Sequence, residues 1–290
     1  MKKIFFIACL LLTCLGCAPS KEPVTTTKKP LLLVSVPPYE SIVQHIAGET
    51  FEVATVVPPS ADPHTYEPTA RGVAAIAEGQ LWFQIGEPFE QKLLPLLPKV
   101  QPFDLREGLP MIESHGASCH CHDAASNMDR HIWLSPKMVA QQIDAIVRTL
   151  SEQYPEKQEE FTIRGKELQE KLAALNLDIE HRLQKTTARS FLISHPAFAY
   201  FCRDYGCHQL SVEQEGKEPR PKELETLLAS ALESGARIAI AVPQHNNKGA
   251  QLIAEKLNIP VRVIDPYANN CMETMRMLAG FLEDPYAQNN

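Results

Sequence analysis

Short apolar runs alternate with amphipathic segments along most of the chain, and this alternation constrains the fold more than any other feature. The apolar runs, typical of strands, lie at 31–36, 51–57, 81–85, 101–105, 190–194, 209–213, 237–242 and 261–264. The segments with helical periodicity lie at 39–47, 69–78, 89–97, 135–153, 196–204, 219–234, 248–257 and 271–283. Strands and helices that alternate in this way are typical of parallel α/β units. The sequence therefore predicts an α/β fold with two similar parallel-sheet lobes, at residues 31–154 and 189–290.

The segment 155–188 separates the two predicted lobes and contains no proline after its first residue. Apolar side chains recur in it at spacings of three, four and seven, at Phe161, Leu168, Leu172, Leu175, Ile179 and Leu183. This periodicity predicts one long helix that joins the lobes rigidly. Gly165 leaves a second arrangement open, in which two helices meet at a kink.

The N-terminus has the features of an export signal. Two lysines precede an uncharged apolar run at 4–12, which is too short to cross a bilayer. The Leu-Gly-Cys sequence that ends at Cys17 resembles a bacterial lipobox, in which the cysteine becomes the lipidated first residue of the mature chain. We therefore expect a signal peptide at 1–16 and a lipidated tether at 17–30. Cleavage of an ordinary signal peptide nearby is the alternative.

Net charge and cysteine usage limit the class of partner and the disulfide pattern. The whole chain carries a net charge of −7, which becomes −9 when the two lysines of the export segment are removed. Nucleic acid is excluded as the main partner, because binding to phosphates needs a basic surface. In an oxidising compartment a bridge can form among Cys202, Cys207 and Cys271, of which the first two are nearest in sequence.

Residue types that bind metals follow three of the predicted strands, at His64, His195 and Asp265. A fourth, His131, lies just before the helix predicted at 135–153. In open α/β sheets, the carboxyl ends of the strands form the crevice in which ligands bind. We therefore expect these side chains to meet in a metal site in the cleft between the two lobes.

Three imidazoles and one carboxylate form a set of donors that suits zinc. Neutral histidine nitrogen is a preferred zinc ligand, and one carboxylate completes a four-coordinate shell while offsetting part of the charge. Each residue taken alone also fits a structural role. In particular, Asp265 stands before a proline and could instead cap a turn.

The stretches around these residues resemble the signatures of the metal-binding solute-binding proteins of ABC transporters, of the zinc and manganese type. His64 lies in D-P-H-T-Y-E-P, His131 in D-R-H-I-W-L-S-P, His195 in H-P-A-F-A-Y-F and Asp265 in V-I-D-P-Y. The second stretch departs from the family pattern D-P-H-x-W-L-D-P at Arg130 and Ser135. The resemblance covers nearly all of the mature chain and implies that these four residues are the metal ligands.

The function that this resemblance implies is high-affinity capture of Zn²⁺ outside the cytoplasm and its delivery to the permease of an ABC transporter. Such a receptor is not an enzyme, and we expect a periplasmic or other extracytoplasmic lipoprotein that acts as a monomer. Manganese-type members commonly carry Glu where His195 stands, so three histidines favour zinc over the alternatives Mn²⁺ and Fe²⁺. A surface adhesin stays open as another function, and a secreted zinc hydrolase would need an open coordination position.

A second group of metal-binding residue types lies in an aperiodic loop at 106–128. Its members are His115, Cys119, His120, Cys121 and His122. Zinc-type members of the family often carry a histidine-rich loop at this place, so the loop could capture a second zinc ion weakly and pass it to the main site. The alternative is a polar insertion whose cysteine pair oxidises, since the close spacing does not match a structural zinc site.

Two more residues are expected to support the ligands. Glu67 lies three residues after His64, and His245 follows the strand predicted at 237–242. Hydrogen bonds from such neighbours orient metal-binding imidazoles and raise their basicity.

Overall fold

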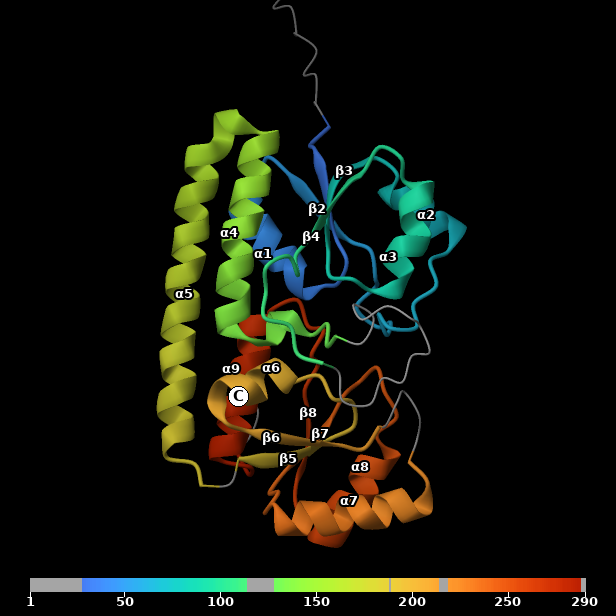
Figure 1. Ribbon diagram of the computed structural model, residues 1–290, viewed down its shortest axis with the longest axis vertical. Helices are drawn as coiled ribbons and strands as arrows, with labels where there is room; N and C mark the ends of the chain where they lie inside the picture. Colours follow the sequence, from blue (N-terminus) through green and yellow to red (C-terminus); the bar gives the residue numbers. More distant parts are fainter. Residues whose placement is uncertain (1–27, 114–127, 188, 214–218, 288–290) are drawn as a thin grey trace, which may run out of the picture.

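Two four-stranded parallel sheets form the frame of the molecule, one in each lobe (Figure 1). The computed structural model describes residues 28–113, 128–187, 189–213 and 219–287. The first sheet has the order β2-β1-β3-β4, with β1 at Leu31–Val34, β2 at Glu52–Thr55, β3 at Gly79–Gln84 and β4 at Gln101–Asp104. The second has the order β6-β5-β7-β8, with β5 at Ser190–Ile193, β6 at His208–Ser211, β7 at Ala239–Ala241 and β8 at Val261–Val263.

Helices connect the strands of both sheets and pack against them. Their bounds are Pro38–Ala47 (α1), Ala70–Ile76 (α2), Pro88–Leu93 (α3), Pro136–Gln153 (α4), Gln158–Gln184 (α5), Ala199–Tyr205 (α6), Pro221–Glu233 (α7), Lys248–Leu257 (α8) and Cys271–Glu283 (α9). Short 3₁₀ turns lie at Leu94–Leu96, Ile132–Leu134 and Pro155–Lys157. In Figure 1, α4 and α5 run along one side of the molecule and α7 and α8 lie at the far end of the second lobe.

The predicted α/β fold of two parallel-sheet lobes is confirmed, and most elements differ from expectation only at their ends. The third predicted helix is shorter because Pro95 cannot donate a helical hydrogen bond, and a 3₁₀ turn takes over at Leu94. The sixth begins at Ala199 and not at Pro196. The residues before it are not helical, and a bond from the Ala197 backbone N–H to the His195 carbonyl, at 2.8 Å, closes a tight turn that carries His195.

The long helix α5 joins the two lobes without interruption. It has 27 residues, which correspond to about 40 Å at 1.5 Å per residue. The helix continues through Gly165, so the kinked alternative is wrong. The apolar face predicted from the periodicity, from Phe161 to Leu183, is buried. It belongs to one hydrophobic cluster with side chains from both lobes, which makes the connection stiff.

Gly165 allows α4 and α5 to approach closely. A Cβ atom there would lie 2.6 Å from Val147 Cγ2. We expect Gly165→Ala to destabilise the protein, because an overpacking cost of about 1–3 kcal/mol exceeds the gain in helix propensity of about 1 kcal/mol. Gly280→Ala in α9 is the matched control, since a Cβ there meets no atom within 4 Å, and it should stabilise. Urea unfolding of both variants checks this, and equal stabilisation by both would contradict it.

The described residues also bear on disulfide bonds and on membrane spans. The cysteines that they include, Cys202, Cys207 and Cys271, are free thiols, so the bridge considered from the sequence is not formed. Within the described ranges, no helix is both long and apolar enough to cross a membrane. The predicted signal peptide at 1–16 and the lipidation site Cys17 lie outside the described residues.

Candidate metal centre

Three histidines from separate parts of the chain converge between the two lobes. His64 lies in the loop after β2, His131 directly before the 3₁₀ turn that leads into α4, and His195 two residues after the end of β5. One ring nitrogen of each lies within 4.8 Å of the others. The Nε2 atoms of His131 and His195 are 3.3 Å apart. This is the arrangement expected of ligands to a common ion.

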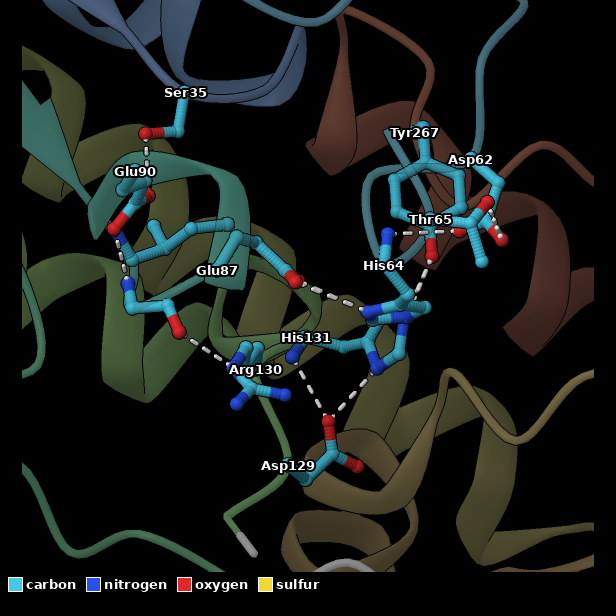
Figure 2. Close-up of polar contacts among 12 residues, drawn as sticks. Ser35, Asp62, His64, Thr65, Glu87, Glu90, Asp129, Arg130, His131 and Tyr267 are labelled. Atoms are coloured by element: carbon cyan, nitrogen blue, oxygen red, sulfur yellow. Dashed lines mark hydrogen bonds and ion pairs between the residues drawn. The ribbon is translucent and has the colours of Figure 1, made fainter. Parts of the chain in front are cut away.

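A turn in the first lobe holds His64, and a buried carboxylate orients its ring. The Asp62 carboxylate accepts hydrogen bonds from the His64 backbone N–H, at 2.9 Å, and from the Thr65 hydroxyl, at 3.0 Å. The Oε1 and Oε2 atoms of Glu87 lie 3.0 and 3.2 Å from His64 Nδ1. Figure 2 shows His64 between these two groups. The Nε2 atom is therefore turned toward the other histidines.

Asp129 fixes both the backbone and the ring of His131. Its Oδ1 atom accepts from the backbone N–H of His131 at 2.8 Å and lies 2.8 Å from the ring Nδ1 (Figure 2). Both side chains are almost fully buried. Trp133, two residues further on, donates from Nε1 to the carbonyl oxygen of Pro266 in the second lobe at 2.7 Å. This bond ties the segment that carries His131 to the opposite lobe.

A carboxylate and a second imidazole hold His195. Glu213 Oε2 lies 3.2 Å from His195 Nδ1 and 3.0 Å from His245 Nδ1. The rings of His195 and His245 are stacked, with centroids 3.8 Å apart and planes 10° apart. A metal ion must lie near the plane of each imidazole that binds it, and one point cannot meet this for two parallel stacked rings. The cluster of His195, Glu213 and His245 therefore positions a ligand and does not form a second metal site.

All three ligand candidates thus have a carboxylate at Nδ1. A carboxylate that accepts from Nδ1–H selects the tautomer whose Nε2 lone pair is free to bind a metal. These carboxylates, which are Glu87, Asp129 and Glu213, were not among the residues predicted from the sequence. A signal was present for each: Glu87 and Glu213 follow strands β3 and β6, and Asp129 lies two residues before His131.

The protonation of His64 and His195 is shifted in opposite directions. Burial lowers the pKa of His64, but the attraction and hydrogen bond of Glu87 outweigh it, so that this pKa rises to about 9. Burial dominates at His195, whose pKa falls to about 3 despite its bond to Glu213. The pKa of Glu213 is lowered in turn, because its bonds to His195 and His245 outweigh the effect of burial. His195 is therefore neutral near pH 7, whereas His64 carries a proton that an arriving cation must displace.

Buried polar groups support the turn that carries Glu87. Glu90 accepts from Ser35 Oγ at 2.6 Å and from the backbone N–H groups of Ile85 and Gly86 at 2.9 and 2.8 Å (Figure 2). Arg130 Nε donates to the carbonyl oxygen of Gly86 at 2.7 Å. Arg130, a departure from the family pattern, therefore links the segment of His131 to the segment of Glu87.

The other departure, Ser135, has a local role at the start of α4. Its hydroxyl accepts from the backbone N–H of Met138 at 3.1 Å, which caps the helix, and it donates to Asp204 of the second lobe. Serine is among the preferred residues at this position. The departure therefore keeps the helix start intact without reaching the metal centre.

The fourth predicted ligand, Asp265, is placed differently from the histidines. Its Oδ1 atom accepts from the backbone N–H of Tyr267 at 2.8 Å and from Gln244 Nε2 at 3.0 Å. Asp265 does not belong to the group whose donor atoms lie within 4.8 Å of one another in the described part of the chain. The turn-capping role left open by the sequence is the one seen. The Tyr267 hydroxyl instead lies 3.0 Å from His131 Nε2 and 3.2 Å from His64 Nε2.

Of the two residues predicted to support the ligands, one lies at the metal centre and the other does not. His245 lies against His195, as described above, whereas Glu67 is exposed and pairs with Lys92 on the surface. Glu87 takes the place at His64 that was expected for Glu67. The predicted second group of metal-binding residues, at His115, Cys119, His120, Cys121 and His122, lies outside the described residues.

Comparison with known proteins decides the family. Residues 32–280 match the family model of ZnuA, the periplasmic component A of the zinc-uptake complex. The chain belongs to this family. A solved structure titled crystal structure of ZnuA superposes on this ZnuA-family chain with a TM-score of 0.82 and 30% identity, over 90% of this chain and 100% of the other.

Two relatives extend the comparison. The ZnuA-family chain is 32% identical over 271 residues to a protein of Chlamydia trachomatis that is provisionally named a metal-binding protein, over 93% of this chain and 96% of the relative. It is 28% identical over 272 residues to the zinc-binding lipoprotein AdcA of Streptococcus pneumoniae. That match covers 89% of this chain and 53% of AdcA, so the chain spans about half the length of AdcA.

Proposed function

We propose that this protein captures Zn²⁺ outside the cytoplasm and delivers it to the permease of an ABC transporter. The observation that carries the proposal is the convergence of three imidazoles whose Nδ1 atoms are each held by a carboxylate. A site with its tautomers already selected needs little rearrangement to bind a metal. The zinc named in the family description and in the name of AdcA supports the choice of cargo.

The chemistry of the donors favours zinc over manganese and iron. Imidazole nitrogen is a borderline donor that suits Zn²⁺, whereas Mn²⁺ prefers carboxylate, carbonyl and water oxygens. The centre offers three nitrogens at His64, His131 and His195. Their carboxylate neighbours point at the far side of the rings and are therefore not donors to the same ion.

The way in which zinc enters and leaves the centre follows from the rigid connection between the two lobes. The helix α5 and the shared hydrophobic cluster oppose a wide hinge motion between the lobes. Local movement of the loops that carry His64 and Tyr267 is the less costly way to open the centre. We further propose that a lipid on Cys17 holds a monomeric receptor at the membrane beside its permease, with residues 17–30 as the tether.

Metal analysis of the full-length protein, purified without added metal, tests the proposal. We expect one Zn²⁺ per chain, retained in competition with a tenfold excess of Mn²⁺, because the nitrogen donors discriminate between the two ions. Deletion of the gene should impair growth in zinc-depleted medium, and added zinc should restore it. Preferential retention of Mn²⁺, or growth unaffected by zinc depletion, would contradict the proposed cargo.

A further inference from the structure

The Tyr267 hydroxyl occupies a defined position among the histidines. Tyr267 is 1% exposed, and its ring packs against the ring of Trp133 with centroids 5.7 Å apart. Its backbone N–H donates to Asp265, and the carbonyl of the preceding Pro266 accepts from Trp133. These contacts fix the side chain from both lobes. Its hydroxyl is therefore held in a fixed position beside the histidines.

Three distances among the Tyr267 oxygen and the Nε2 atoms of the histidines fit those of a coordination tetrahedron. Zinc bonds of 2.0–2.1 Å place any two tetrahedral donors about 3.4 Å apart. The His131 and His195 Nε2 atoms are 3.3 Å apart, and the Tyr267 oxygen lies 3.0 Å from His131 Nε2 and 3.2 Å from His64 Nε2. Three of the six distances between these four atoms are therefore close to the separation that a zinc ion at their centre requires.

Asp265, which the sequence predicts as the carboxylate ligand, instead makes hydrogen bonds within its own turn and to Gln244. Its Oδ1 atom holds the turn that presents Tyr267 and bonds Gln244, whose Nε2 also donates to the carbonyl of Pro59 in the first lobe at 3.1 Å. Moving this carboxylate toward the histidines would break the bond to Tyr267 N and release the turn. The Tyr267 oxygen needs no such movement.

We propose that Tyr267 supplies the fourth donor to the captured metal ion, and that Asp265 positions it. The inference rests on the proposed zinc-binding function. As zinc binds, the O–H bond of Tyr267 and the N–H bond of protonated His64 at its metal-facing nitrogen break and both protons pass to solvent, because a bound dication makes its ligands more acidic. The resulting phenolate supplies the negative charge that a carboxylate would otherwise supply to three neutral imidazoles.

Zinc titration of the full chain, followed by the ultraviolet difference spectrum of tyrosinate, tests the assignment. We expect the wild type to gain a tyrosinate signal in proportion to bound zinc, up to one equivalent. Tyr267→Phe, which keeps the packing on Trp133, should lose that signal and bind zinc at least about tenfold more weakly. Asp265→Asn should keep the signal, because its side-chain oxygen can still accept from the Tyr267 backbone. Thermal melting before zinc is added shows that the variants fold alike.

The outcomes separate this inference from the proposed function. Wild-type affinity in Tyr267→Phe, or zinc binding by the wild type without a tyrosinate signal, overturns the assignment of Tyr267 and leaves zinc capture standing. Loss of affinity in Asp265→Asn with the Tyr267→Phe variant unaffected assigns the fourth donor to the carboxylate. A wild-type protein that binds no zinc overturns the proposed function itself, and the inference with it.

Discussion

His131→Ala is expected to weaken zinc binding by more than about 100-fold. Removing a residue that only hydrogen-bonds to a metal ligand costs up to about 100-fold in affinity, and this variant removes the ligand itself. His131 is 4% exposed, and its Nε2 atom faces both His195 and Tyr267. Alanine removes a donor and leaves the Asp129 carboxylate without the ring that it orients. Isothermal titration with Zn²⁺, in competition with a chelator where binding is tight, measures the change.

His181→Ala provides the matched control for this variant. His181 is exposed on α5, away from the metal centre, so its removal tests for a general effect of losing a histidine. We expect the control to bind zinc as the wild type does. Affinity within tenfold of the wild type in His131→Ala would contradict the assignment of His131, provided that both variants melt near the wild-type temperature.

The strands and helices could be predicted because each leaves a local pattern. The buried parallel strands read as continuous apolar runs, and α5 shows its buried face at helical spacing from Phe161 to Leu183. His64 and His195 followed from the carboxyl ends of the strands that precede them, and His131 followed from its place just before the helix predicted at 135–153. These inferences need only the sequence near each residue and a general property of α/β sheets.

The orienting groups depend on which strands are neighbours, and sequence order does not give this. In the second sheet β5 lies between β6 and β7, so Glu213 after β6 and His245 after β7 flank His195 after β5. Once that strand order is known, the trio follows directly. Without it, Glu213 reads only as the polar end of a strand.

The fourth donor is harder to foresee because it depends on the shape of a single turn. Asp265 and Tyr267 lie two residues apart, and either could reach the histidines from the end of β8. The choice is made by the bond from Tyr267 N to Asp265 and by the bond from Trp133 to Pro266, which spans 133 residues. Contacts between such distant residues leave no local pattern in the sequence.

Zinc affinity is expected to keep rising with pH well above about 6.5, the pKa of an ordinary histidine. Glu87 raises the pKa of His64 to about 9, so below this pH zinc must displace a proton from His64. The need to displace this proton therefore lowers the zinc affinity as the pH falls. For a single group of pKa 9, the loss is about 50-fold from pH 9 to pH 7. His195, with a pKa of about 3, adds no such dependence in this range.

Glu87→Gln isolates the contribution of His64 to this pH dependence. Without the carboxylate, burial governs the ring and lowers its pKa, so the part of the slope due to His64 between pH 7 and 9 should disappear. Burial, more than the neighbouring Glu87, raises the pKa of Tyr267 well above its ordinary value, so Tyr267 is protonated between pH 7 and 9 in both proteins. A proton leaving it adds the same slope to both, and the change with pH in the ratio of the two affinities therefore reports on His64. The exposed Glu67, changed to Gln, is the matched control and should keep the wild-type slope. Parallel slopes in wild type and Glu87→Gln, measured in chelator-buffered zinc, would show that Glu87 does not hold a proton on His64.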